Sequence, residues 1–142
     1  MKEVLVFDVN ETLLDVRAMA PPFEAALGDV ALLPQWFGQM LRNSLVATVT
    51  RTYAPFHVQG VDALRLTAQR VGVDLSVWNA LSLVEAMTEL PPHPDVIPAL
   101  DRFQSAGVRL ATLTNSVPGI AEAQLRNAGL SQVVFDNVSV TS

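Results

Sequence analysis

The sequence contains no cysteine, only two histidines and a single lysine, Lys2. Without cysteine, a disulfide framework, a thiolate metal site and a cysteine nucleophile are all excluded. Two isolated histidines are a poor basis for a zinc site, so we expect no resident metal ion. Nine basic residues against fourteen acidic ones give a formal net charge of −5, which argues against binding to nucleic-acid phosphates.

Long apolar runs are also missing. The N-terminal run, Val4–Phe7, is too short for the core of a signal peptide. No stretch approaches the roughly 20 apolar residues of a membrane span. Half of the residues are nevertheless hydrophobic, which excludes intrinsic disorder. The length of 142 residues is typical of about one folded domain. We therefore expect a cytoplasmic protein with no membrane partner.

Both ends of the chain alternate between strand-like and helix-like segments. Val4–Phe7 is a continuous apolar run, typical of a strand that is buried on both faces of a parallel sheet. Further strands are predicted at 108–113 and 133–135, each preceded by a helical pattern. This alternation indicates an α/β fold with parallel strands and right-handed crossovers.

The middle of the chain has a different pattern and reads as an all-helical insertion. We predict an α/β core made of 1–14 and 91–142, interrupted by helices at 15–90. Because the insertion follows the first strand directly, we expect it to lie over the carboxyl end of that strand.

Three helices are predicted within the insertion. The first starts at Pro34, and its apolar residues recur at every fourth position: Phe37, Leu41, Leu45 and Val49. The second starts near Val61, and the third starts after Ser76, a suitable N-cap. No regular element is predicted for the weakly patterned, proline-containing stretch 21–34.

Two polar loops follow the first two strands of the core, where ligands bind in open α/β sheets. The first loop begins with Asp8, an acid placed directly after a buried strand. Such a carboxylate can act as a nucleophile and form an ester that water later cleaves. The hydroxyls of Thr12 and Thr114 and the amide of Asn115 would hold this carboxylate or a substrate oxygen.

The residues around these loops resemble a known family. Residues 7–15 are similar to the first motif of the haloacid dehalogenase superfamily, Asp-x-x-x-Thr after a buried strand, and residues 113–115 are similar to its second. The similarity is greatest to the type II 2-haloacid dehalogenases: Trp36 lies on the long insertion helix, followed by Tyr53, Phe56 and Ala-Leu-Arg-Leu-Thr at 63–67. The resemblance covers nearly the whole chain.

The resemblance implies a Rossmann-like core with a helical cap. It makes Asp8 the nucleophile, with Thr12, Thr114 and Asn115 around it. It also places Asn10 beside the nucleophile, and Trp36 and Phe37 along the substrate pocket of the cap. The reaction of this branch needs no metal or organic cofactor, whereas a phosphatase of the superfamily would need Mg²⁺.

Three features depart from the family pattern. Asn10 stands where the phosphatases have a second Asp and the dehalogenases have Tyr, and an amide cannot shuttle a proton. Phe37 stands where the dehalogenases carry an Arg that holds the halide. The superfamily's motif Lys and acidic loop, expected after the strand at 133–135, are absent, because the sole lysine precedes the first strand. We therefore expect a core that is truncated at its C-terminus.

Several functions remain open at this point. The first is a hydrolase that acts on a small 2-haloacid through Asp8. The alternative is a truncated, non-catalytic homologue that acts through partner binding or self-association, such as a homodimer formed through Val4–Phe7 as an exposed sheet edge. A Mg²⁺-dependent phosphatase is least favoured because of Asn10.

Other polar residues are expected to have ordinary surface roles. Glu11 and Asp15 read as solvated loop acids, and His57 and His93 as exposed loop histidines. Arg42 is expected on a helix surface. Asp136 is expected in a turn that follows the strand at 133–135.

Overall fold

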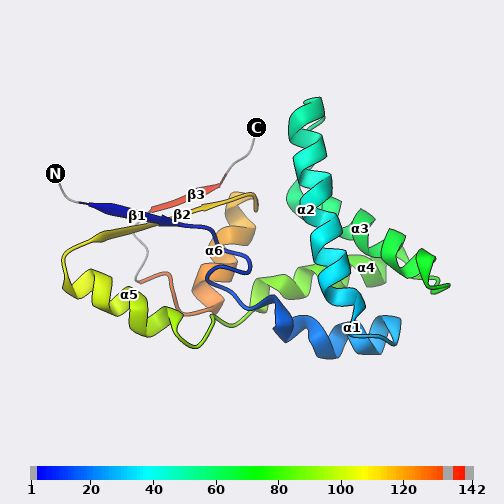
Figure 1. Ribbon diagram of the computed structural model, residues 1–142, viewed down its shortest axis with the longest axis horizontal. Helices are drawn as coiled ribbons and strands as arrows, with labels where there is room; N and C mark the ends of the chain where they lie inside the picture. The colour runs from blue at the N-terminus through cyan, green and yellow to red at the C-terminus, as the bar shows by residue number, and fades with distance from the viewer. Residues whose placement is uncertain (1–2, 133–135, 140–142) are drawn as a thin grey trace. The chain divides into compact units, whose positions relative to one another are not determined.

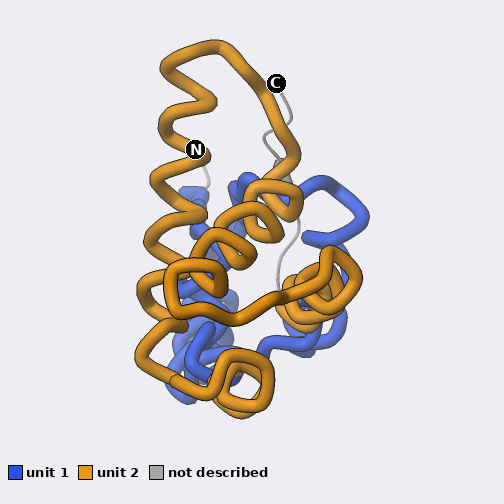
Figure 2. Tube along the Cα trace, turned by 90° about the vertical axis from the view of Figure 1, so that its right-hand side faces the viewer, with its two compact units in different colours: residues 1–18, 88–141 blue, residues 19–87, 142 orange. Residues whose placement is uncertain are grey.

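A computed structural model gives the fold of the chain and describes residues 3–132 and 136–139. The chain divides into two compact units (Figure 2). Unit 1 combines Met1–Ala18 with Thr88–Thr141, and unit 2 consists of Met19–Met87. These boundaries lie a few residues inside the helical insertion expected at 15–90.

Unit 1 is built on a parallel sheet of three strands in the order β1-β2-β3 (Figure 1). The strands are β1 (Val4–Phe7), β2 (Arg109–Thr114) and β3 (Asp136–Ser139). The connecting helices α5 (Val96–Ser105) and α6 (Pro118–Asn127) both lie on one face of the sheet. Right-handed crossovers between parallel strands that follow one another in sheet order require this arrangement. The α/β prediction is therefore confirmed.

The strand β1 is less buried than its apolar sequence predicts. Val4 and Val6 are 45% and 58% exposed, whereas Leu5 and Phe7 are half-buried. Successive side chains of a strand point to opposite faces of the sheet; Phe7 faces α5, where its ring lies 6.4 Å from that of Phe103, so Val4 and Val6 lie on the opposite face. The strand also pairs with β2 on one side and has no strand beyond it among the described residues. The prediction of a strand buried on both faces is wrong for this part of the chain, and Val4–Phe7 is an edge.

The start of β3 also differs from expectation. The strand predicted at 133–135 falls outside the described residues. Asp136 and Asn137 lie within β3, paired in parallel with Ala111 and Thr112 of β2, rather than in a turn that follows a strand.

The two segments that connect the units, 13–15 and 91–93, pair with each other within unit 1. Leu14 and Pro92 form an antiparallel bridge. The Asp15 N–H donates to the Pro91 carbonyl (2.9 Å), and the His93 N–H donates to the Leu13 carbonyl (3.0 Å). These bonds satisfy backbone groups that a buried crossing would otherwise leave unpaired. They hold the segment that leaves unit 1 against the segment that returns to it.

Unit 2 is helical. Its elements, together with the short turn of helix that leads into it, are η1 (Val16–Met19), α1 (Ala20–Leu27), α2 (Leu32–Thr50), α3 (Phe56–Arg70), α4 (Val77–Glu85) and η2 (Ala86–Glu89). The helix α1 was not predicted, because Pro21 and Pro22 obscured the pattern. Both prolines occupy its first turn, where no intrahelical N–H partner is needed. The predicted N-cap is confirmed: Ser76 Oγ accepts the Asn79 N–H at 3.1 Å. No helix of the described residues has the length and apolar character that a membrane span requires.

The buried face of α2 differs from the predicted one. Leu41, Leu45 and Val49 are exposed, at 41%, 67% and 83%. The face that packs inside unit 2 carries Leu33, Trp36 and Met40 instead. A residue spacing of four fits both faces of this apolar helix, so periodicity alone could not choose between them.

Candidate active site

The two polar loops predicted from the sequence lie at the same edge of the sheet. Phe7 is paired with Thr112 of the parallel neighbour, so Asp8, the next residue, lies where β2 approaches its end at Thr114. The carboxyl ends of adjacent parallel strands are where open α/β sheets place their ligands. The topology therefore brings the Asp8 loop and the Thr114–Ser116 loop together.

Asp8 is exposed to solvent, and its carboxylate has a local partner. The Thr12 hydroxyl donates to Asp8 Oδ2 at 3.4 Å. Partial burial raises the pKa of Asp8 above its usual value of 3.8, although hydrogen bonds from the Val9 N–H and the Thr12 hydroxyl lower it. Because the effect of burial is the largest, the site costs this carboxylate part of its hydration.

The loop after Asp8 is tightly folded. The N–H groups of Leu13 and Leu14 both donate to the Val9 carbonyl, at 2.9 and 3.0 Å, and the Glu11 N–H donates to Leu14 at 2.9 Å. Glu11 itself lies in the left-handed region, with φ 65°. These bonds close the loop between Val9 and Leu14, within which Thr12 lies.

Asn10 does not point into open space beside Asp8. It is 8% exposed, and its Oδ1 accepts a hydrogen bond from Gln124 Nε2 at 2.8 Å. Its Nδ2 donates to Ser116 Oγ at 3.5 Å, and Ser116 Oγ donates in turn to Gln124 Oε1 at 3.4 Å. The predicted contact between Asn10 and a substrate is therefore revised: its amide joins a buried network.

This buried network connects both loops to α6. Thr114 is 2% exposed, and its Oγ1 accepts the Ser116 N–H at 3.2 Å. Asn115, between them, is exposed. Thr114 therefore supports the loop from inside the unit, while Asn115 is the more accessible of the two predicted residues.

Sequence reasoning missed Gln124 and gave Ser116 no role. Gln124 is 1% exposed, on the same face of α6 as Ala121 and Leu125. That spacing is the available signal, because a polar residue at core positions of a helix needs a partner. The partner lies 114 positions away in the sequence, so only the fold identifies it.

Trp36 and Phe37 belong to unit 2. Trp36 is fully buried, its indole N–H donates to the Gly60 carbonyl at 2.9 Å, and its ring lies 5.0 Å from that of Phe23. These contacts favour a packing role over the predicted substrate contact. Phe37 is half-buried, with its ring 6.3 Å from Trp36. A substrate contact by Phe37 stays a prediction.

Arg42 lies on the surface of α2, as expected. Its Nη2 donates to Gln39 Oε1 at 3.0 Å, one helical turn away. It lines a concavity of about 210 Å³ in unit 2 together with Arg70 and Thr67.

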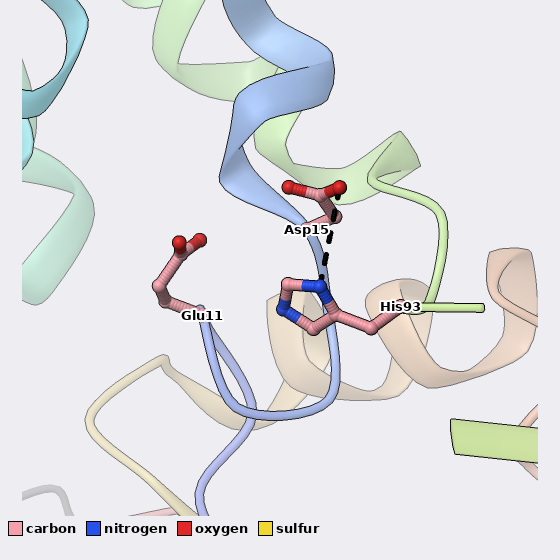
Figure 3. Close-up of side chains that lie close together, drawn as sticks. All are labelled: Glu11, Asp15 and His93. Carbon is pink, nitrogen blue, oxygen red and sulfur yellow. Dashed lines mark ion pairs between the residues drawn. The ribbon is translucent and has the colours of Figure 1, made fainter. Parts of the chain in front are cut away.

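A second polar cluster lies beside the Asp8 loop. It consists of Glu11, Asp15 and His93 (Figure 3), and one ligand atom of each lies within 4.8 Å of those of the others. His93 Nδ1 is 3.9 Å from Asp15 Oδ2. Asp15 also forms a bidentate pair with Arg17, whose hydrogen bonds lower the pKa of the Asp15 carboxyl below its usual value. The side chains of His93 and Asp15 are 20% and 19% exposed. They are therefore more buried than the predicted surface roles imply.

The sequence is similar to those of several curated 2-haloacid dehalogenases. The (S)-2-haloacid dehalogenase of Xanthobacter autotrophicus is 30% identical over 140 residues, which is 97% of this chain and 54% of that protein. The (S)-2-haloacid dehalogenase of Pseudomonas sp. (strain YL) is 28% identical over 130 residues, 89% of this chain and 55% of that protein. The chain therefore spans little more than half the length of these relatives.

Solved structures agree with the sequence relatives. The L-2-haloacid dehalogenase from Xanthobacter autotrophicus with chloropropionic acid covalently bound superposes with a TM-score of 0.91 at 27% identity, over 99% of this chain and 57% of that one. The pattern that defines the haloacid dehalogenase-like hydrolases matches residues 2–142. The chain belongs to the haloacid dehalogenase-like hydrolase family.

Proposed function

We propose that this protein is a hydrolase that removes halide from a small 2-haloacid, with Asp8 as its nucleophile. The observation that carries the proposal is the place of Asp8: a partly desolvated carboxylate at the carboxyl end of β1, oriented by Thr12. The likeness to (S)-2-haloacid dehalogenases over nearly the whole chain supports the substrate class.

The proposed reaction has two steps, a displacement of halide and the hydrolysis of an ester. An Asp8 carboxylate oxygen attacks the α-carbon of the substrate, a carbon–oxygen bond forms, and the carbon–halogen bond breaks with its electron pair leaving on the halide. Water then attacks the carbonyl carbon of the Asp8 ester, and the bond between that carbon and the ester oxygen breaks. One proton of the water goes to the departing oxygen, which leaves in the 2-hydroxyacid, and the other is released to solvent as the Asp8 carboxylate is restored. Neither step requires a metal ion or an organic cofactor.

The neighbouring residues have separate tasks in this proposal. The Thr12 hydroxyl orients the nucleophile, and we expect the Asn115 amide to bind the substrate carboxylate. Asn10, Ser116 and Gln124 hold the two loops in register from inside unit 1. Proximity and orientation of this kind account for a large share of a displacement barrier. That unit 2 caps the site stays part of the proposal.

Chloride release from each enantiomer of 2-chloropropionate, measured by ion chromatography, tests the proposal. We expect release from the S enantiomer and a loss of at least about a thousandfold in Asp8→Asn, since removing a catalytic nucleophile costs up to about 10⁶ in kcat. Asp101→Asn, an exposed acid on α5, is the matched control and should keep full activity. Equal rates in Asp8→Asn and wild type would refute Asp8 as the nucleophile.

A single turnover in H₂¹⁸O distinguishes the ester route from direct attack by water. The ester route places ¹⁶O from Asp8 in the 2-hydroxyacid and leaves ¹⁸O in the Asp8 carboxylate. Direct attack by water places ¹⁸O in the product. The same preparation, assayed with p-nitrophenyl phosphate and Mg²⁺, tests the phosphatase alternative, for which we expect no release.

We also propose that the chain associates with itself through β1. The outer edge of β1 presents its backbone groups, and the exposed side chains of Val4 and Val6 lie on the adjoining face of the sheet; such edges are templates for strand pairing. Light scattering after size exclusion should show a dimer, and Val6→Lys should shift it to monomer. Val49→Lys makes the same change at an exposed valine of α2 and should not. A wild-type monomer at tens of micromolar would refute the proposal.

A further inference from the structure

The cluster formed by Glu11, Asp15 and His93 lies where the two inter-unit connections cross (Figure 3). Glu11 and Asp15 belong to the segment that leaves unit 1, and His93 belongs to the segment that returns. All three lie within unit 1. Two carboxylates and one imidazole thus converge from segments about 80 positions apart in the sequence.

The backbone on each side of the cluster is fixed independently of the side chains. Asp15 and His93 are held by backbone bonds across the crossing, to Pro91 and Leu13. Glu11 Oε2 accepts the Val16 N–H at 2.9 Å, which fixes the Glu11 side chain against the segment that leads into unit 2. The donor atoms are therefore gathered before any ligand binds, so binding loses less conformational freedom.

The formal net charge of the cluster is negative, which favours binding of a cation. The formal charges of Glu11, Asp15 and Arg17 sum to −1. Arg17 donates to both carboxylate oxygens of Asp15, so an ion that binds Asp15 takes the place of the guanidinium. The Arg17 side chain is 74% exposed and can move into solvent when the ion binds.

We propose that Glu11, Asp15 and His93 bind a divalent first-row transition-metal ion of the Zn²⁺ type. One imidazole nitrogen and two carboxylate oxygens are a ligand set that Zn²⁺ accepts, with water completing the shell. An imidazole ligand favours this class over Mg²⁺ and Ca²⁺, which prefer oxygen alone. Bound there, the ion joins the two connections and stabilises unit 1, independently of the proposed hydrolase reaction.

Calorimetric titration of the metal-free chain with Zn²⁺ alone tests this site. We expect one ion per chain, a rise in Tm with Zn²⁺ because the ion binds only the folded state, and at least tenfold weaker binding of Mg²⁺. His93→Gln and Glu11→Gln should each weaken Zn²⁺ binding by at least about tenfold, since even outer-shell partners of a metal contribute 10–100-fold.

His57→Gln is the matched control, because His57 is the other histidine of the chain and belongs to unit 2. It should leave Zn²⁺ affinity unchanged. Each variant is compared with itself with and without Zn²⁺, so a shift in its own stability does not disturb the result. The proposal is overturned if wild type binds no Zn²⁺ at millimolar concentration, if His93→Gln binds as tightly as wild type, or if Mg²⁺ binds equally well.

A second readout does not depend on the variants. In the wild-type chain, Zn²⁺ should shift the ring resonances of His93 and leave those of His57 in place. Shifts confined to His57 would place the ion in unit 2 and overturn the assignment.

Discussion

The interiors of the two units differ in kind. Unit 1 buries a set of polar side chains around the ends of its first two strands: Asn10, Thr112, Thr114, Ser116 and Gln124. The interior of unit 2 is filled mainly by large apolar side chains, among them Phe23, Trp36, Met40 and Leu64, with Gln59 and Thr67 as its buried polar residues in the described part.

This difference separates the unit that contains the proposed active site from the helical unit. Burying a polar group costs stability unless it is hydrogen-bonded. In unit 1 these groups bond one another and join the loop that follows Asp8 to the loop that follows β2, so their burial shapes the loops of the proposed active site. In unit 2 the buried polar residues Gln59 and Thr67 bond backbone carbonyls of the same unit. The predictions below test this contrast, starting with the largest expected effect.

Trp36→Ala should destabilise unit 2 by about 3–5 kcal/mol, the usual cost of removing a large buried ring. The substitution removes a fully buried side chain and leaves the Gly60 carbonyl without its indole donor. Amide hydrogen exchange read by mass spectrometry should show faster exchange in peptides from 19–87, with peptides from 96–127 little changed. Trp78→Ala, at a 77% exposed site on α4, is the control and should change neither. An equal increase in exchange rate in the peptides of both units would contradict the expected confinement of the effect to unit 2.

Gln124→Leu should act in the opposite unit. It leaves Asn10 Oδ1 buried without its donor, at a cost of about 1–3 kcal/mol. Faster exchange is expected in peptides from 96–127. Gln132→Leu, at an exposed site of unit 1, controls for the loss of an amide.

A double variant sharpens this prediction. Asn10→Leu combined with Gln124→Leu removes both partners, and the pair should cost clearly less than the sum of the two single variants. Additive costs would mean that the network contributes no coupling. Chloride release in the same variants would report separately how far the network positions Asp8.

The two aspartates at the ends of the first loop should respond to pH in opposite directions. The pKa of Asp8 is raised by burial, so its folded carboxyl holds a proton more tightly than the unfolded chain does. Its contribution to stability is present below pH 3.8 and is lost as pH rises through the folded pKa. Asp8→Asn should therefore be more stable than wild type at pH 7 and equal to it near pH 3, by urea denaturation.

Asp15→Asn should show the reverse. The Arg17 hydrogen bonds lower the pKa of Asp15, so the stabilisation is present above pH 3.8 and is lost as pH falls through the folded pKa. The variant should be less stable than wild type at pH 7, with the difference vanishing in acid. Differences of the same sign for both variants would contradict the two pKa directions.

The smallest effect is expected on the exposed face of α2. Leu45→Gln should change stability by no more than about 0.5 kcal/mol, because Leu45 is 67% exposed. Met40→Ala, on the buried face, should cost about 2–5 kcal/mol. Tryptophan fluorescence during urea denaturation follows both, since both tryptophans lie in unit 2. A large loss of stability in Leu45→Gln would instead support burial of the helix face predicted from the sequence, which contains Leu41, Leu45 and Val49.

Local sequence was enough for much of the fold. The apolar run before Asp8, the Ser76 N-cap and the change of pattern around 91 are properties of neighbouring residues, and the strands and helices that they predict are present. The motif around Asp8 and Thr12 was readable for the same reason, because its two residues are four positions apart. Local pattern failed at Pro21 and Pro22, where two prolines marked the start of a helix.

By itself, the sequence determined the α/β class, the family and the nucleophile candidate, because each follows from local patterns and from their order along the chain. Only the tertiary structure decided the environment of those residues. The buried face of α2, the partnership of Asn10 with Gln124 and the gathering of His93 with Glu11 all depend on contacts between distant segments. Composition does not encode such contacts one at a time, since burial and hydrogen bonding are properties of the folded chain as a whole.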